Sequence, residues 1–309
     1  MLKKVSLVIK AIFVIGLLFF IASFLGKYFW FFDLISHFRI QALVMFALCL
    51  SYFIIIRENV FIVFNVSVVL FILYSIFPYY FPQPKYRADT TYTLLYANVL
   101  TSNEQNSLLV SMINNTNPDI IALVEVNEEW MYQLNCIAKE YQYKIVLPHD
   151  DNFGVCLLSK IDISESEVIN FCTLDLPSVF AKLKTKDDSF SILITHTIPP
   201  VGHFDFIQRN LHLSRLHAFA ANNHVNMVVG DLNCSSFSPN FNILLNDNML
   251  RDSRSGFGLQ PTWPTWCPLF YTTLDHIIVD EHLLVCDRKV LQNIGSDHLP
   301  LVIKFGLKH

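Results

Sequence analysis

Residues 227–233, Met-Val-Val-Gly-Asp-Leu-Asn, carry the most information about the fold of this chain. A short apolar run ends in Gly-Asp-x-Asn, which is typical of a buried strand that delivers a carboxylate and a carboxamide to the edge of a sheet. Asp231 and Asn233 are two positions apart, so on an extended backbone their side chains point the same way. Because Gly, Asp and Asn are also common turn residues, the stretch alone is equally compatible with a strand followed by an ordinary turn.

The composition divides the chain into two parts. Of its 309 residues 53% are hydrophobic, more than in an ordinary soluble protein. The excess lies before residue 85, where only six Lys or Arg and two Asp or Glu residues occur, out of 22 and 26 in the whole chain. The remainder therefore has 16 basic and 24 acidic residues, a net charge of −8. We expect a membrane region at residues 1–84, a short stiff linker at 81–85 and a catalytic domain at 85–309 that is long enough to bury a core.

Three apolar segments, at about residues 5–25, 40–56 and 59–81, each approach the roughly 20 residues that a helix needs to cross a bilayer. The first could instead be a signal peptide, but no small-residue cleavage site stands out and two further segments follow it. Aromatic residues at 28–32 and 79–81 fit interfacial belts. Lys and Arg residues are equally frequent on the two sides of the membrane, so their count does not decide the orientation. The first helix usually decides it, and here it favours a cytoplasmic N-terminus. Three membrane-spanning helices would then place the catalytic domain outside the cytoplasm.

The seven cysteines form no C-x-x-C pair and no zinc-ligand spacing. We expect them to be thiols of the core. Export of the domain would permit disulfides, but the sequence does not choose their pairing.

Strand-like and helix-like segments alternate after residue 92, and strand then follows strand. This order indicates a mixed sheet system with helices on its outer faces. The predicted strands are 93–99, 120–124, 143–147, 154–158, 179–185, 190–195, 225–230, 274–279 and 299–305. The predicted helices are 106–115, 128–141 and 206–221.

Polar residues recur where these predicted strands end or begin. They are Asn98, Glu125, His196, Asp231, Asn233, Asp275, Asp297 and His298. In layered α/β folds, functional sites gather at strand ends. Several acids that converge there would repel one another unless a cation neutralised them. Oxygen ligands without a cysteine cluster suit Mg²⁺ or Mn²⁺.

The ordered set of motifs resembles the endonuclease/exonuclease/phosphatase superfamily over about residues 92–305. It includes Gly-Asp-Leu-Asn at 230–233, Leu-Asp-His at 274–276 and Ser-Asp-His at 296–298, besides Asn98, Glu125, His196 and a Gly-x-x-Leu-Ser-Lys-like strand at 153–160. The stretches 260–264 and 295–300 resemble a bacterial membrane-anchored branch. The resemblance implies a four-layer α/β/β/α sandwich, metal-dependent attack of water on a phosphate ester, and a place in the bacterial inner membrane.

The resemblance also implies roles for the motif residues at the metal and at the nucleophile. Glu125 is the principal metal ligand, with Asp297 close to the same ion, and Asn98 supports the metal or a phosphate oxygen. Asp231 orients or deprotonates the attacking water, and Asn233 binds the scissile phosphate.

Three further residues follow from the same resemblance. Asp275 pairs with His298, so that the imidazole contacts the phosphate or takes a proton. His196 is a phosphate ligand or general acid, although Thr-His-Thr departs from the commoner Thr-His-Leu. Independently of the resemblance, Arg209 lies near the start of the predicted helix 206–221 and is a candidate substrate contact, although a surface ion pair is the favoured role for it. His276 should point to the opposite face of its strand and is expected to be structural.

The substrate is a phosphodiester of either nucleic acid or a lipid head group. A nuclease ranks first because no lipid-specific insertion is visible, although the charge of −8 offers no basic face for nucleic acid. Membrane tethering supports the alternative, a phospholipid (sphingomyelinase-like) or inositol-phosphate hydrolase. A catalytically inactive binding domain is disfavoured because every motif acid and histidine is present. No obligate protein partner is expected.

Overall fold

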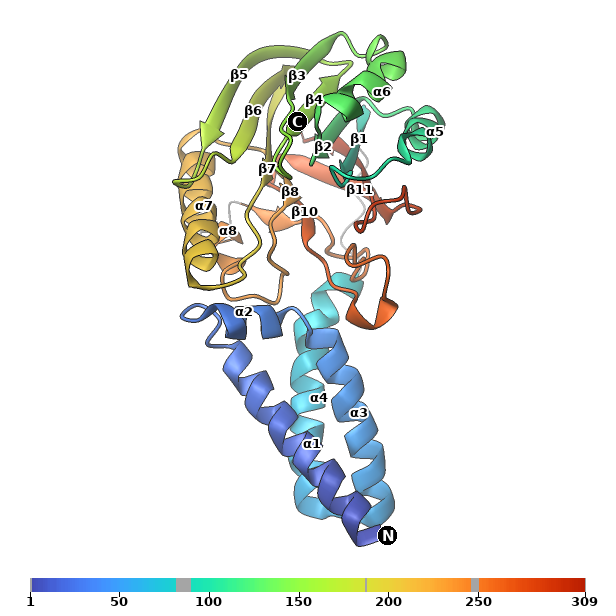
Figure 1. Ribbon diagram of the computed structural model, residues 1–309, viewed down its shortest axis with the longest axis vertical. Coiled ribbons are helices and arrows are strands. Elements are labelled where there is room, and N and C mark those ends of the chain that lie inside the picture. The colour runs from blue at the N-terminus through green and yellow to red at the C-terminus, as the bar shows by residue number, and fades with distance from the viewer. Residues whose placement is uncertain (1, 82–89, 187, 246–249, 309) are drawn as a thin grey trace.

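The computed structural model describes residues 2–81, 90–186, 188–245 and 250–308. A bundle of long helices forms one end of the molecule, and a sandwich of two sheets forms the other (Figure 1). The expected boundary between residues 84 and 85, and all but the first residue of the expected linker, lie outside the described residues.

Helices α1 (Leu2–Ser23), α3 (Arg39–Ile56) and α4 (Asn59–Tyr80) are long and apolar enough to cross a bilayer. The residues that they bury against one another are largely aromatic and include Phe13, Phe20, Phe46 and Phe53. Lys10, the charge that interrupts the first apolar segment, places its ammonium 2.6 Å from the carboxylate of Glu58. This pairing removes an isolated charge from an apolar helix.

A short helix, α2 (Trp30–Ser36), lies between the long helices and the sandwich (Figure 1). It contains most of the aromatic cluster at residues 28–32. Its one acid, Asp33, is fully buried and turns toward the sandwich, where Ser238 and Asn240 donate hydrogen bonds to it.

The first sheet has the strand order β11-β12-β1-β2-β4-β3. Its strands are β1 (Thr91–Asn98), β2 (Ile120–Val124), β3 (Tyr143–Leu147), β4 (Val155–Ser159), β11 (Leu283–Val290) and β12 (Leu301–Leu307). The second sheet has the order β5-β6-β7-β8-β10-β9. Its strands are β5 (Asp162–Asn170), β6 (Pro177–Lys184), β7 (Ser189–His196), β8 (Met227–Asp231), β9 (Arg251–Asp252) and β10 (Asp275–Val279).

The two sheets pack face to face over one apolar core, to which β1 and β2 contribute alternate residues from one side and β7 and β8 from the other. Helices α5 (Asn106–Thr116) and α6 (Glu128–Ala138) cover the outer face of the first sheet. Helices α7 (His203–Asn222) and α8 (Asn242–Leu245) cover that of the second sheet. The predicted four-layer α/β/β/α sandwich preceded by three long apolar helices is therefore confirmed.

Loops at one edge of the sandwich contact the helical region. In the loop before β10, Tyr271 accepts a hydrogen bond from Gln41 at 3.0 Å, and Thr272 donates to the carbonyl of His37 at 3.0 Å. The loop after β8 contacts Asp33 as described above, and the amide of Gly258 donates to the carbonyl of Tyr79 at 2.7 Å. Since Asp231 ends β8 and Asp275 begins β10, the edge that carries these acids is the edge that faces the helices.

The thiols of the seven cysteines are free. Cys49, Cys156, Cys172 and Cys234 are buried, whereas Cys136 and Cys286 are exposed. The expectation that all are core thiols is thus wrong for the last two.

Candidate active site

Strand register brings the polar strand ends together. In the second sheet, His196 lies opposite Asp231 in the parallel pair β7–β8, and Asp231 lies opposite Asp275 in the antiparallel pair β8–β10. In the first sheet, Asn98 lies opposite Val124, so Glu125 follows directly beside it. The residues that the sequence predicted at separate strand ends therefore meet at one edge of the sandwich.

Gly230 permits the close approach of β7 and β8. A Cβ atom at this position would lie 1.8 Å from the carbonyl oxygen of Thr195, the residue before His196. The glycine in the Gly-Asp-x-Asn motif is therefore required by the packing of the neighbouring backbone.

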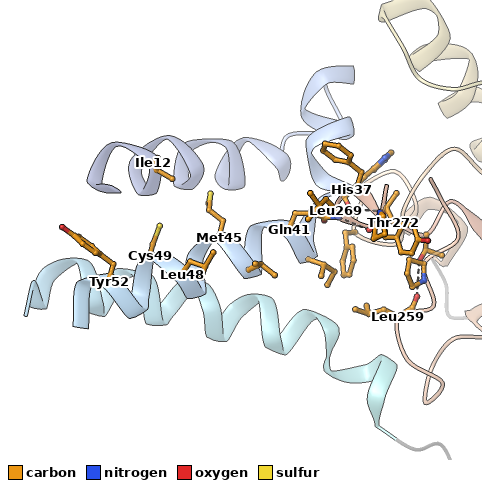
Figure 2. Close-up of a pocket in the computed structure, with 18 of the residues that line it drawn as sticks. Ile12, His37, Gln41, Met45, Leu48, Cys49, Tyr52, Leu259, Leu269 and Thr272 are labelled. Atoms are coloured by element: carbon orange, nitrogen blue, oxygen red, sulfur yellow. Dashed lines mark hydrogen bonds between the residues drawn. The ribbon is translucent and has the colours of Figure 1, made fainter. Parts of the chain in front are cut away.

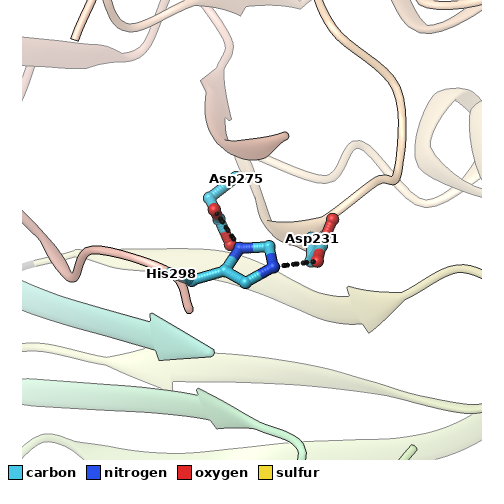
Figure 3. A group of neighbouring side chains, drawn as sticks. All are labelled: Asp231, Asp275 and His298. Atoms are coloured by element: carbon cyan, nitrogen blue, oxygen red, sulfur yellow. Dashed lines mark hydrogen bonds and ion pairs between the residues drawn. The ribbon is translucent and has the colours of Figure 1, made fainter. Parts of the chain in front are cut away.

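His298 lies between two carboxylates, as Figure 3 shows. Its Nδ1 is 2.7 Å from Asp275 Oδ2, and its Nε2 is 3.5 Å from Asp231 Oδ2. Burial disfavours the charged imidazolium, but the charges of Asp275 and Asp231 outweigh burial and raise the pKa of His298 to about 10. The imidazole is therefore protonated at neutral pH and can donate from Nε2.

Tyr96 holds the other oxygen of Asp275, and sequence reasoning missed it. Its hydroxyl donates to Asp275 Oδ1 at 2.8 Å from the facing sheet. The pKa of Tyr96 is well above its usual value because of burial and the neighbouring carboxylates, so the hydroxyl remains a donor. Tyr96 is two positions before Asn98 in the same strand, so the side-chain alternation that points Asn98 inward could have identified it.

Asn98 and Glu125 form the second half of the site. Asn98 Nδ2 donates to Glu125 Oε1 at 2.8 Å and to Asp231 Oδ2 at 3.3 Å, so it connects the two acids. Burial raises the pKa of Glu125, while His196 and the Asn98 amide act in the opposite direction. Glu125 also adopts a φ of 62°, a left-handed conformation that side chains other than glycine rarely adopt.

One carboxylate oxygen of Glu125 accepts no hydrogen bond from the described residues. This oxygen, Oε2, is buried. A buried carboxylate oxygen without a partner is costly, and a cation is a natural partner for it. The donor set around Glu125 therefore fits a hard divalent metal ion.

Asp231, Asp275 and His298 are also close enough to one another to hold a cation. His298, however, has both ring nitrogens directed at carboxylates and a raised pKa. Both nitrogens therefore carry protons, and neither is free to bind a metal ion. This arrangement suits proton transfer better than metal ligation.

His196 and Asn233 complete the edge. The Nδ1 of His196 is 2.8 Å from the carbonyl of Asn152, so Nδ1 carries the proton and Nε2 faces Asp231 at 3.7 Å and Glu125 Oε1 at 3.9 Å. Asn233 has a φ of 45°, and its side-chain amide donates to the carbonyl of Thr197 at 2.7 Å. The backbone just after β7 thus holds the side chain of Asn233, and the loop before β4 holds that of His196.

Asp297 lies at the rim of the site and is half-buried. One of its oxygens accepts a hydrogen bond from the indole of Trp263 at 3.2 Å, and the ring of Trp263 lies 6.4 Å from that of His298. Trp263 therefore contacts the site, whereas Trp266 is 69% exposed.

His276 points away from the site, as expected from its position, and its Nε2 contacts the carbonyl of Cys234 at 2.8 Å.

Arg209 occupies a different place from the one expected of a substrate contact. It is fully buried, its guanidinium pairs with Asp33 of α2, and it donates to the carbonyl of Asn233 at 2.8 Å. The sequence offered a substrate contact or a surface ion pair; the structure has a buried ion pair between residues 176 positions apart. Asp33, which sequence reasoning did not single out, is thereby linked to the backbone of the candidate site.

Comparisons with known proteins identify the family and agree with the fold. A sequence model described as the Endonuclease/Exonuclease/phosphatase family matches residues 95–298. An endonuclease/exonuclease/phosphatase family protein from Bacteroides thetaiotaomicron is 16% identical, with a TM-score of 0.60 over 72% of this chain and 100% of that one. D. rerio TDP2 complexed with single-strand DNA product is 17% identical, with a TM-score of 0.60 over 71% and 100%.

A mannosyl-6-phosphatase from B. thetaiotaomicron is 16% identical, with a TM-score of 0.55 over 69% of this chain and 99% of that one. No functionally curated protein matches the chain in sequence. The structural likenesses show a shared fold, and the family match covers all the strand-end residues from Asn98 to His298. The chain belongs to the Endonuclease/Exonuclease/phosphatase family.

Proposed function

We propose that this chain is a membrane-anchored phosphodiesterase that depends on Mg²⁺ or Mn²⁺ and uses Glu125 as its principal metal ligand. The observation that carries the proposal is the buried, unpartnered Oε2 of Glu125, which Asn98 connects to Asp231. Asp297 and Asn98 would be the other protein ligands of the metal ion. The cation, when bound, neutralises charge that develops on the phosphoryl oxygens.

The other residues would act on the water and on the phosphate. Asp231 orients the attacking water or accepts its proton, since its Oδ2 lies near both histidines. His298 is held protonated by Asp275 and Asp231, and so can donate to a phosphoryl oxygen as negative charge develops there. Asn233 and His196 would contact the remaining phosphoryl oxygens.

The test uses the full-length protein and a chromogenic diester, bis(p-nitrophenyl) phosphate. We expect turnover with Mg²⁺ or Mn²⁺ and none in EDTA. Glu125→Gln and His298→Ala should each lower turnover about a hundredfold or more, the scale for losing a positioned charged group. EDTA-resistant turnover, or near-normal rates in either variant with folding intact, would contradict the proposal.

A nuclease is the candidate among polymeric substrates, and it is supported by the likeness in fold to TDP2 bound to a single-strand DNA product. The net charge of −8 on residues 85–309 argues against tight, backbone-driven binding of nucleic acid. Cleavage of a single-stranded oligonucleotide at a rate above that of the chromogenic diester would support the nuclease.

The three long helices would place the protein in a bacterial inner membrane with its catalytic domain outside the cytoplasm. A reporter fused after residue 309 that is active only outside the cytoplasm is the expected result. A fusion active only inside the cell would reverse the orientation.

A further inference from the structure

A cavity of about 740 Å³ runs from the long helices to the edge of the sandwich that carries the candidate site. Figure 2 shows its two ends. Ile12 of α1 and Tyr52 of α3 lie at the end far from the sandwich, while His37, Leu259 and Thr272 lie at the end beside it. Its volume lies within the roughly 300–1,000 Å³ of small-molecule sites.

Apart from Gln41 and the hydroxyl of Tyr52, the wall of this cavity along α3 is apolar, and it is about as long as one leaflet of a bilayer. It extends from Ile40 to Tyr52 and includes Val44 and Leu48. At about 1.5 Å per residue these positions span roughly 18 Å, while half of a hydrocarbon core of about 30 Å is roughly 15 Å. Leu48 is 68% exposed, so the cavity is open on the side of the bundle that would face lipid.

The end beside the sandwich carries polar atoms that lack partners. His37 is 7% exposed, and its Nε2 is buried with no hydrogen-bond partner within the described part of the chain. The same holds for Oε1 of Gln41, one turn further along. The cavity is therefore apolar over most of its length and offers a donor or acceptor at one end, which matches a long hydrocarbon chain attached to a polar group.

This polar end adjoins the candidate active site. Pro261 and Thr273 line the cavity. Thr262, the residue after Pro261, accepts at Oγ1 from the amide of Asp275 at 3.4 Å, so the lining of the cavity is directly connected to the start of β10.

We propose that the cavity between α1, α3 and the loop at residues 259–273 binds the hydrocarbon chain of a membrane lipid and thereby presents the phosphodiester of that lipid to the catalytic edge. This rests on the proposed function, because the chain site would serve the same phosphodiesterase. The substrate class is then a phosphodiester with one long aliphatic chain. The chain enters from the leaflet next to the sandwich.

Two chromogenic diesters that differ only in chain length test this substrate class. The full-length protein in phosphatidylcholine bilayers is given p-nitrophenyl methyl phosphate or p-nitrophenyl hexadecyl phosphate with Mg²⁺. We expect kcat/KM for the hexadecyl ester to exceed that for the methyl ester at least tenfold. Equal values for the two esters would overturn the proposal.

Substitutions on two helices separate the cavity from general partitioning into the bilayer. Leu48→Trp fills the cavity, and the preference for the hexadecyl ester should fall at least tenfold. Leu70 of α4 is 60% exposed and does not line the cavity, so Leu70→Trp should keep the preference. A preference that survives Leu48→Trp, or one that both variants lose equally, would overturn the proposal.

A binding measurement distinguishes failure of this proposal from failure of the proposed function. Phosphatidylcholine with a diazirine in its acyl chain is photolysed with the protein, and labels are counted in the tryptic peptides 40–57 and 58–85. We expect labels to be concentrated at least threefold in 40–57 in the unsubstituted protein and to be lost in Leu48→Trp. Even labelling would overturn the chain site. Concentrated labelling without turnover of either ester would support the chain site and overturn the phosphodiesterase.

Discussion

At the scale of single residues, buried polar groups at the candidate site are held by specific partners, and these partners decide their charge. Tyr96 and His298 bind the two oxygens of Asp275 from different elements. Asn98 donates to two carboxylates, those of Glu125 and Asp231. A site of this kind is sensitive to the loss of one hydrogen bond, because the group left behind stays buried.

Tyr96→Phe should lower turnover about tenfold, since a hydrogen bond to a charged group contributes roughly 1.5–3 kcal/mol. The apparent affinity for Mg²⁺ should not change, because Tyr96 contacts Asp275 and not Glu125. Tyr141 is the control: it is equally buried, but its hydroxyl donates to the carbonyl of Pro118. Tyr141→Phe should lower the melting temperature and leave turnover unchanged. Equal turnover in both variants would remove Tyr96 from the positioning of Asp275.

Buried neutral histidines make the fold sensitive to acid. Burial lowers the pKa of His212 and of His276 to about 3 each, from an ordinary 6.5. Their folded pKa lies below the unfolded one, so their stabilisation is complete above pH 6.5 and declines as pH falls toward 3. By pH 5 each should have lost about 2 kcal/mol. The melting temperature should therefore fall between pH 7 and pH 5.

His212→Gln tests this account, because glutamine can still bond to the hydroxyl of Thr195, which lies 2.7 Å from His212 Nε2, but does not titrate in this range. The variant should lose less of its melting temperature between pH 7 and pH 5 than the unsubstituted protein does. An identical fall in both would show that His212 is not the source of the acid sensitivity.

At the scale of elements, strand register determines which side chains meet. The parallel pairing of β7 with β8 and the antiparallel pairing of β8 with β10 put residues from three strands side by side. The same register required a glycine before Asp231, since the neighbouring carbonyl leaves no room for a Cβ atom.

Gly230→Ala should lower the free energy of unfolding by more than about 2 kcal/mol, because a methyl group would have to displace the backbone of β7. Gly202 is the matched control: its φ of 97° is strained for alanine, but no atom lies within 4 Å of the added Cβ. Gly202→Ala should cost only about 1 kcal/mol. Denaturant unfolding of both variants measures the difference, and an equal cost would mean that backbone conformation, not contact with Thr195, is what excludes a side chain at residue 230.

At the scale of the whole molecule, the sandwich is joined to the helices by a buried ion pair. Asp33 of α2 binds Arg209 of α7, and Arg209 in turn binds the carbonyl of Asn233. Burial raises the pKa of Asp33, but the charge of Arg209 and the hydrogen bonds from Ser238 and Arg209 outweigh burial and lower it. The edge that carries the candidate site is thereby held toward the end of the long helices.

Asp33→Asn should destabilise the protein by about 3–5 kcal/mol, since it leaves the guanidinium of Arg209 buried without a countercharge. Asp287 is the control: it pairs with Lys289 at 2.6 Å, but the two side chains are 46% and 64% exposed. Asp287→Asn should change stability by less than about 1 kcal/mol. Thermal unfolding of the full-length variants provides the comparison. A small effect of Asp33→Asn would indicate that water reaches Arg209 and that the joint between helices and sandwich is loose.

Several elements were predictable because they bury one regular face. The apolar runs of β2, β8 and β10 predicted strands within one or two residues of their observed bounds, and the three long helices follow from length and apolar composition. The strands β5 and β11 were not predicted. β5 is an edge strand with most of its side chains exposed, so it lacks the apolar alternation that identifies a half-buried strand.

The sequence by itself determined the layered fold, the membrane-length helices and the set of polar residues at strand ends, because these depend on local periodicity and on motif order. The tertiary structure alone decided that Tyr96 reaches Asp275, that Arg209 pairs with Asp33 and that the edge with the candidate site faces the helices. These contacts join residues up to 235 positions apart. Their physical basis is the packing of one sheet on another and of the sandwich on the helices, which leaves no periodic signal in the chain.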